Sequence, residues 1–316
     1  MYDTIHFWLP HHEAGKYCVD EVADRLSNVR EIVDRTTGEM RAIGNVDNLK
    51  ITAHVSGLSI RGSLAKYHFP DNTYTLTRRD VKEAITKLSD TLGVDLRKAN
   101  VTRMDVSANL MMRNEVERYF DVLGLCAYFN RVQASKNTLY YQSKGKDLTK
   151  AMAFYDKARE VGHAGGSMPE VFDGFRLLRY ESRWITRLPH QLKESEVKGA
   201  TLSDERFYGK VIGLWSENYF SIEKKRTLRT DAMENLKTVS DCVAYICAFA
   251  LQRVPAEELQ QIMCDLKDAR ILNNRTDYAR LKKKLKDLST KADITEADTL
   301  VKELDAEVRQ VLAYKR

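Results

Sequence analysis

The sequence is short of the residues that mark several large classes of protein. It has five cysteines in 316 residues, and no two of them form a CxxC pair. Neither a zinc ribbon nor a dithiol redox centre is indicated, and reduced thiols in a reducing compartment are expected. Phosphate loops of the types GxxxxGK(S/T) and GxGxxG are absent as well, which disfavours an ATPase or a dinucleotide enzyme. No pair of histidines is separated by a single residue, so no histidine-pair metal motif is visible.

Long hydrophobic runs are also missing. The longest, residues 242–251, is too short to span a bilayer and is expected to form a buried helix. The first residues predict a strand, DTIHFWL, that stops at Pro10, and they lack the pattern of a signal peptide. The sequence therefore predicts a cytoplasmic protein without a membrane segment. Its formal charge of +6 is compatible with a polyanionic partner.

Because glycine and proline are sparse, at 15 and 5 residues, regular elements are expected to dominate. The first part of the chain alternates strand-like runs with a few helices. A hairpin is predicted around Ser56-Gly57, and a helix between Thr77 and Gly93 with its apolar residues on one face. Further predicted elements are a strand over 100–112, a helix over 114–124, and strands over 137–143, 149–157 and 175–186. This order predicts an α+β fold, an antiparallel sheet with helices on one face.

The remainder of the chain, from about residue 201, has an almost wholly helical pattern. Ser203 and Thr295 are predicted to cap the first and last helices, and Pro255 to open another. We therefore predict two domains, an α+β domain over 1–195 and an all-helical domain over 196–316.

Three strand segments share a pattern of charge. Side chains alternate along a strand, so TRMDVSA places Arg103 and Asp105 on one face. In the same way RLLRYESRW places Arg179, Glu181 and Arg183 on one face, and MAFYDK places Tyr155 and Lys157 together. If these strands are neighbours, one face of the sheet carries two acids, a tyrosine and a lysine, rimmed by arginines.

Such a face has the residues needed for phosphoryl transfer. Carboxylates are ligands for Mg²⁺ or Mn²⁺, and a bound cation polarises a phosphate oxygen. A tyrosine hydroxyl, with an ordinary pKa of about 10, needs a nearby cation such as Lys157 to become a nucleophile. Spacing alone also fits salt-bridged strand residues for Asp105 and Glu181, and a packing role for Tyr155.

Clusters of basic residues favour nucleic acid as the partner. Lysines and arginines are dense over residues 275–291 and 224–229, and Lys144 and Lys146 lie in the turn SKGKD. Such clusters provide sequence-independent affinity for phosphates. A solvated helix face explains the 275–291 cluster equally well.

The three segments also resemble a known family. TRMDVSANL, AFYDKAREV and LLRYESRWITR, in this order, resemble the replication initiators of the filamentous-phage gene II/X type, and rolling-circle plasmid initiators of the Rep_trans type carry a similar series. The N-terminal MYDTIHFWLP and the segment SIRGSLAKYHFPDN are similar too. The resemblance covers roughly residues 1–190.

The resemblance implies an endonuclease that nicks one strand at an origin, forms a 5′-phosphotyrosine link and later rejoins the strand. It implies that residues 1–195 form the catalytic nicking and joining domain, with DNA binding or oligomerisation as the role of the helical domain over 196–316. By position, Tyr155 is the nucleophile and Lys157 its partner, while Asp105, Glu181 and, less securely, Glu160 hold Mg²⁺ or Mn²⁺. The expected DNA-binding residues are Arg103, Arg179, Arg183, Tyr140, Tyr141, Lys144 and Lys146, with Tyr140 and Tyr141 also competing as nucleophiles. His54 stays open as a further metal ligand.

The resemblance further implies single-stranded origin DNA as the partner and the cytoplasm of a bacterial host as the location. A host helicase and a second copy of the chain are further candidate partners. Two alternative functions stay open: a non-catalytic origin-binding or regulatory protein, and a hydrolytic metal-dependent nuclease without a covalent intermediate.

Overall fold

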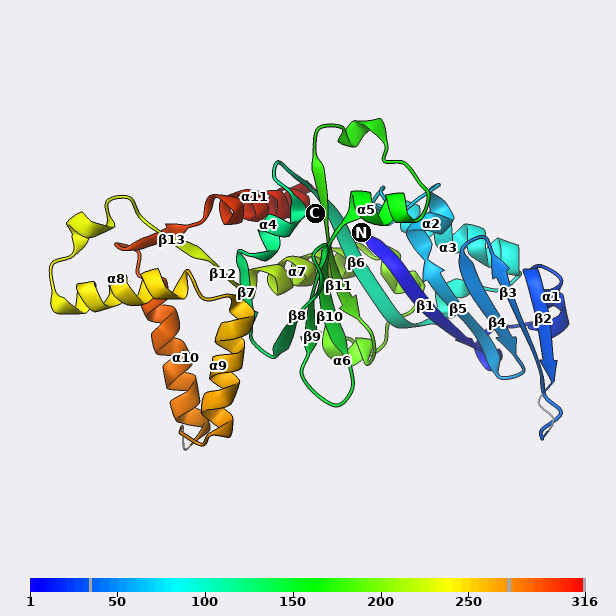
Figure 1. Cartoon of the computed structure of the whole chain (residues 1–316). Helices are drawn as coiled ribbons and strands as arrows, with labels where there is room; N and C mark the ends of the chain where they lie inside the picture. Colours follow the sequence, from blue (N-terminus) through cyan, green and yellow to red (C-terminus); the bar gives the residue numbers. More distant parts are fainter. Residues whose placement is uncertain (34–35, 272–273, 315–316) are drawn as a thin grey trace.

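A ten-stranded antiparallel sheet forms the body of the molecule (Figure 1). The computed structural model describes residues 1–33, 36–271 and 274–314. The strand order is β2-β3-β4-β5-β1-β6-β11-β10-β9-β8. These strands are β1 (Tyr2–Pro10), β2 (Ser27–Val33), β3 (Met40–Val46), β4 (Leu49–His54), β5 (Gly57–Ser63), β6 (Asn100–Met112), β8 (Phe129–Ser135), β9 (Thr138–Ser143), β10 (Lys150–Asp156) and β11 (Arg176–Trp184).

Two small strand pairs and a set of helices complete the fold. The pairs are β7 (Leu123–Cys126) with β12 (Ile222–Lys224), and β13 (Arg226–Leu228) with β14 (Thr295–Ala297). The helices are α1 (Val19–Ala23), α2 (Leu64–His68), α3 (Arg78–Leu92), α4 (Val116–Phe120), α5 (Lys157–His163), α6 (Leu188–Leu192), α7 (Glu205–Phe220), α8 (Val239–Leu251), α9 (Ala256–Asp268), α10 (Arg275–Ser289) and α11 (Thr299–Tyr314). None of the helices in the described ranges is long and apolar enough to cross a membrane.

The two faces of the sheet differ in chemistry. One face is apolar and packs against helices: Phe154 of β10 stacks on Tyr180 of β11, with ring centroids 4.6 Å apart, and Tyr180 contacts Trp215 of α7. The opposite face, which we call the open face, carries the polar residues of the same strands. The predicted α+β fold with an antiparallel sheet is confirmed.

The ends of a helix are predicted most accurately from the sequence where capping residues are present. Helix α3 has a capping box in which Thr77 and Asp80 bond each other's backbone N–H, and it ends at Gly93 in the left-handed region with φ 69°. Both ends were predicted from these residues. The predicted strand over 100–112 is confirmed as β6, and the hairpin at Ser56-Gly57 as β4 and β5.

Several predicted elements differ from the structure. The strand predicted to reach Lys157 ends at Asp156, whose carboxylate accepts the N–H of Arg159 and caps α5. Thr295 belongs to the short strand β14 rather than to a helix cap. Helix α4 stops at Phe120, because the chain turns there into β7. The residues expected to form a buried helix lie in α8, where Ile246 is 64% exposed.

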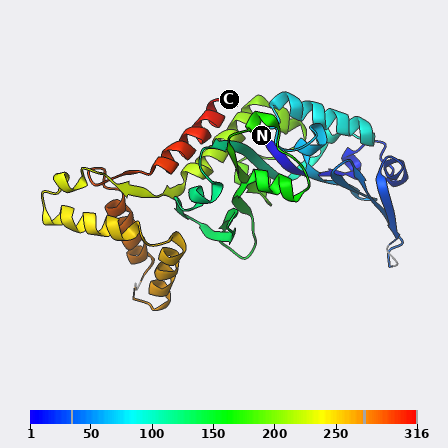
Figure 2. The same ribbon diagram turned by 45° about the horizontal axis from the view of Figure 1, so that its top comes forward.

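The hydrophobic core does not divide at the boundary predicted at residue 195. Phe207, Trp215 and Tyr219 of α7 and Leu304 and Val308 of α11 are buried in the same cluster as the sheet. A second, small cluster lies under α8 and is centred on alanines of that helix. The region that stands apart is therefore the arm formed by α8, α9 and α10, which projects from the body (Figures 1 and 2).

This shared core predicts unequal effects of truncating two large apolar side chains. Trp215→Ala should lower the free energy of unfolding by about 3–5 kcal/mol, because it empties a fully buried site against the sheet. Ile246→Ala, on the exposed side of α8, should change it by less than about 0.5 kcal/mol. Urea unfolding of the full chain measures both, and an unchanged midpoint for Trp215→Ala would show that α7 is not part of the sheet's core.

Candidate active site on the open face

The register of three neighbouring strands brings the predicted site residues together. Asp105 of β6 lies opposite Arg183 of β11, and Tyr155 of β10 lies opposite Arg179 of β11. Opposite residues in an antiparallel pair share a face, and Glu181 shares it because it lies two residues from each arginine. The predicted common face of Asp105, Glu181 and Tyr155 is therefore confirmed.

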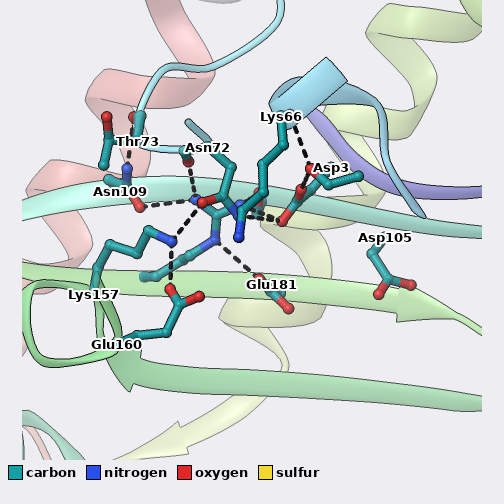
Figure 3. A network of polar contacts seen from close by, with 12 residues as sticks. Asp3, Lys66, Asn72, Thr73, Asp105, Asn109, Lys157, Glu160 and Glu181 are labelled. Carbon is teal, nitrogen blue, oxygen red and sulfur yellow. Dashed lines mark hydrogen bonds and ion pairs between the residues drawn. The ribbon is translucent and has the colours of Figure 1, made fainter. Parts of the chain in front are cut away.

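The centre of this face is the guanidinium of Arg179, which is 3% exposed. It donates five hydrogen bonds, to the carboxylates of Asp3 (2.5 Å) and Glu181 (2.9 Å), the hydroxyl of Ser107 (2.7 Å), the backbone carbonyl of Asn72 (2.7 Å) and the side-chain oxygen of Asn109 (3.2 Å). Figure 3 shows four of these partners, Asp3, Asn72, Asn109 and Glu181, gathered around the centre of the network. The role of a phosphate ligand predicted for Arg179 does not fit this placement, since all its donors face protein groups away from solvent.

Four of the five residues that accept hydrogen bonds from Arg179 were not predicted from the sequence: Asp3, Asn72, Ser107 and Asn109. Asp3 lies two and four residues before the buried Ile5 and Phe7 in the same strand, so alternation alone would place its side chain on the core face. A bulge in the pairing of β1 with β6, between Tyr2 and Ile5, turns it to the open face instead. The presence of an aspartate at a position where alternation expects an apolar residue was the sequence signal that could have identified Asp3 as part of the site. Asn72 lies in the loop after α2 and offers no comparable signal.

The hydroxyl of Tyr155 donates a 2.6 Å hydrogen bond to Oε1 of Glu181. Burial is the main cause that raises the pKa of this phenol well above its usual range, with a further contribution from the neighbouring Glu181. Burial would also raise the pKa of Glu181, but Arg179 and Arg183 outweigh it and lower that pKa to about 2. Tyr155 is thus a protonated phenol bound to an ionised carboxylate at neutral pH.

Lys157 enters the site from the first turn of α5 rather than from the strand. Its ammonium is completely buried, donates a 2.7 Å hydrogen bond to the side-chain oxygen of Asn72, and pairs with the carboxylate of Glu160 (Figure 3). Burial, followed by the field of Arg179, lowers its pKa. Within the described residues no hydrogen bond joins Lys157 to Tyr155, so the direct partnership predicted for these two residues is not formed in this structure.

The two predicted metal-binding acids are held by partly exposed arginines. Asp105 accepts hydrogen bonds of 3.0 and 2.8 Å from Arg103, and burial raises its pKa. Arg183 lies 2.6 Å from Oε2 of Glu181 and 3.9 Å from Oδ2 of Asp105, so one guanidinium spans both carboxylates. The side chains of Arg103 and Arg183 are 27% and 24% exposed, which leaves both open to solvent.

Other predicted ligands do not join this pair of acids. Glu160 is bound to Lys157. His54, which the sequence left open as a further ligand, lies on β4, and β5 and β1 separate that strand from β6, so the structure does not bring His54 to Asp105. In the described ranges, the group of three side chains close enough to share a metal ion is His68, Asp80 and Glu83, none of which was predicted.

The predicted DNA-binding residues fall into two groups. Tyr140 lies on the open face, with the guanidinium of Arg183 5.6 Å from its ring centroid, and Lys144 and Lys146 are exposed in the loop between β9 and β10. Tyr141 points the other way: it is fully buried and donates a 2.7 Å hydrogen bond to the carbonyl of Gly124. Base stacking or nucleophilic attack by Tyr141 is therefore ruled out in this arrangement.

An antiparallel sheet with helices on one face and a tyrosine, two acids and three arginines on the other defines an α+β protein with a charged site on an open sheet. The chain belongs to the Phage_CRI family, described as the N-terminal part of a phage replication-associated protein, and the family model matches residues 1–203. The resemblance to gene II/X-type initiators is confirmed, and the chain is a replication initiator of this type.

The structure is also similar to that of the rolling circle replication initiator protein from Geobacillus stearothermophilus. The TM-score is 0.41 and the identity 14%, and the match covers 73% of this chain and 87% of that chain. No curated protein matches the sequence.

The buried position of Arg179 predicts a large effect on stability. Arg179→Ala leaves the carboxylates of Asp3 and Glu181 buried without their shared cation, which should cost about 3–5 kcal/mol. Arg103→Ala, which removes the partner of one buried acid and leaves Arg183 beside that acid, should cost less, about 1–3 kcal/mol. Equal losses in urea unfolding would contradict the central role of Arg179.

Proposed function

We propose that this protein nicks one strand of origin DNA with Tyr155, stays linked to the new 5′ end, and later rejoins the strand. The observation that carries the proposal is the hydrogen bond from the Tyr155 hydroxyl to Glu181, inside a network of acids and arginines, in a chain of a replication-initiator family. The partner is origin DNA in single-stranded form, and the site of action is the cytoplasm of the bacterial host.

In the proposed step, Oη of Tyr155 attacks the phosphorus atom of a phosphodiester. The new Oη–P bond replaces the bond from phosphorus to the 3′ oxygen, which leaves as a 3′-hydroxyl after taking a proton from water. Glu181 accepts the proton of Tyr155, since its carboxylate already holds that hydrogen bond. Rejoining is the reverse attack by a 3′-hydroxyl, and because the bond energy is conserved in the adduct, it needs no nucleotide cofactor.

Glu181 is a weak base while two arginines bind it, as its pKa of about 2 shows. Arg183 is the arginine that can leave, because it is partly exposed whereas Arg179 is buried. A DNA phosphate competes with Glu181 for Arg183. When Arg183 moves from Glu181 to the phosphate, the basicity of Glu181 rises. The incoming substrate therefore activates the residue that deprotonates Tyr155.

The donor set on this face fits a hard divalent cation. Asp105 and Glu181 offer carboxylate oxygens on the same face, and Arg183 already lies between them as a positive group. Mg²⁺ or Mn²⁺ at this position would polarise a phosphate oxygen. Glu160 and Lys157 bind each other, and Lys157 also binds Asn72, so we assign them to supporting the site rather than to the cation.

Electrostatic support for the phosphate comes from residues around this centre. Arg103, Arg183, Lys144 and Lys146 are accessible to DNA, and Tyr140 presents a ring beside Arg183 for stacking with a base. The α8–α10 arm adds the exposed Lys283 and Lys284 of α10. We assign to this arm the DNA binding or oligomerisation that the sequence predicted for the helical region.

Substitution of the nucleophile gives the most specific functional test. Tyr155→Phe should abolish the covalent adduct with a labelled, randomised single-stranded DNA library, whereas Tyr140→Phe should keep it. Denaturing gels detect the adduct. Cleavage without an adduct would instead indicate a hydrolytic nuclease, and binding without cleavage an origin-binding protein.

Arg183 should compete with a divalent cation for the two acids. Arg183→Ala should tighten Mn²⁺ binding about tenfold or more, because it removes a unit charge from the position between Asp105 and Glu181. Asp105→Asn in the same background should remove this gain. Calorimetry on DNA-free protein measures both, and an unchanged Mn²⁺ affinity in Arg183→Ala would place the cation elsewhere.

A further inference from the structure

A row of basic side chains leads across the open face from the candidate active site toward β4. Lys50 of β4 lies directly opposite Arg61 of β5, Arg61 lies opposite His6 of β1, and His6 lies opposite Arg103 of β6. We call these four residues the basic row. In Figure 1 their strands lie side by side, to the right of β11. The row thus runs over four neighbouring strands and ends beside Asp105, the acid that Arg103 binds.

The basic row is unfavourable for the isolated protein. Like charges directly opposite each other on a sheet repel, and Lys50 with Arg61 is such a pair. None of the open-face positions of β3, β4 and β5 that pair across the sheet holds an aspartate or glutamate. Neither Lys50 nor Arg61 forms an ion pair with any residue that the structure describes, and both are exposed. A polyanion is the partner that would relieve this repulsion.

The field of the row also acts on the histidine within it. Burial lowers the pKa of His6 to about 4, and Arg103 and Arg61 contribute in the same direction. His6 is therefore neutral at physiological pH and can donate or accept a hydrogen bond between two arginines.

An aromatic residue lies beside the row. Trp8 of β1 is opposite Ser59 and partly exposed, and its ring approaches that of His54, with centroids 6.4 Å apart. These residues line a shallow hollow of about 290 Å³ together with Arg41, Lys50, Thr52 and Arg61. Gly57, with φ 149°, allows this close packing: a Cβ there would overlap the carbonyl oxygen of Leu9 and lie 3.1 Å from Cζ2 of Trp8. A flat aromatic surface flanked by cations is the arrangement that binds unpaired bases and their phosphates.

We propose that β4, β5, β1 and β6 form a track for single-stranded DNA that continues from the nicking site, with phosphates on Lys50, Arg61 and Arg103 and a base on Trp8. The proposal rests on the proposed function, because it gives the strand that Tyr155 cuts a path over the sheet. β4 lies five strands from β10, about 24 Å at about 4.8 Å a strand, so a long oligonucleotide reaches Lys50 at the far end of the row and a short one at the nick does not. Single-stranded DNA fits better than a duplex, since a duplex hides its base faces from Trp8.

The test compares the full chain with Lys50→Gln/Arg61→Gln by fluorescence anisotropy on labelled oligo(dT) over a range of salt concentrations. The matched control is Lys82→Gln/Arg206→Gln, which removes two exposed charges from α3 and α7, the helices on the other face. The row variant should bind long oligo(dT) roughly tenfold more weakly, with the slope of log K against log salt reduced by about 1.4, for two phosphate contacts. Trp8→Leu should lose roughly tenfold with an unchanged slope.

Binding by the row variant equal to that of the control overturns the track. Tighter, row-dependent binding of a duplex of the same length overturns the assignment to single strands. The adduct assay separates the two proposals. If the wild-type chain forms no adduct but binds oligo(dT) through the row, nicking by Tyr155 fails and the track stands. If the adduct forms and the row variant binds like the control, the track fails and nicking stands.

Discussion

The structure of the site depends on one buried cation. Arg179 is 3% exposed and binds Asp3 on β1, Ser107 and Asn109 on β6, Glu181 on its own strand, and the carbonyl of Asn72 in the loop after α2. Burying a guanidinium away from water is costly, and this cost is tolerated here because Nε and both Nη atoms donate hydrogen bonds to oxygen atoms of the protein. The same contacts fix the carboxylate of Glu181, and Glu181 in turn holds the hydroxyl of Tyr155. Packing, charge balance and the orientation of the candidate nucleophile are thus coupled through one residue.

The arginines of the open face differ in burial, and this divides their roles. Arg179 is enclosed and positions Glu181, whereas Arg103 and Arg183 reach solvent while they bind Asp105 and Glu181. Farther along the sheet, Lys50 and Arg61 have no acid opposite them. The positive charge therefore becomes progressively less neutralised from the buried centre toward β4. A gradient of this kind favours the approach of a polyanion over the sheet, and in the proposed function the phosphate of that polyanion then competes for Arg183.

Much of this arrangement could be predicted from period-two alternation. It assigned Asp105, Glu181 and Tyr155 to one face, since strand geometry alone fixes which residues share a face, and capping residues located α3. What alternation could not supply was strand order and irregular backbone. The bulge that turns Asp3 outward and the loop that delivers Asn72 depend on tertiary contacts. The start of α5 at Lys157 had a local signal, because Asp156 caps that helix, but the strand pattern across it hid the change. Alternation also separates the neighbours Tyr140 and Tyr141 onto opposite faces, but only the pairing of β9 with β10 determines that Tyr140 is the one on the face of Tyr155.

The central claim is that Tyr155, oriented by Glu181, becomes covalently attached to DNA. The most direct measurement is mass spectrometry of peptides from protein trapped with single-stranded DNA and digested with protease and nuclease. The account predicts a nucleotide remnant on the tyrosine of the peptide that contains AMAFYDK, at Tyr155 alone. A remnant on Tyr140, or cleaved DNA with every tyrosine peptide unmodified, would contradict it.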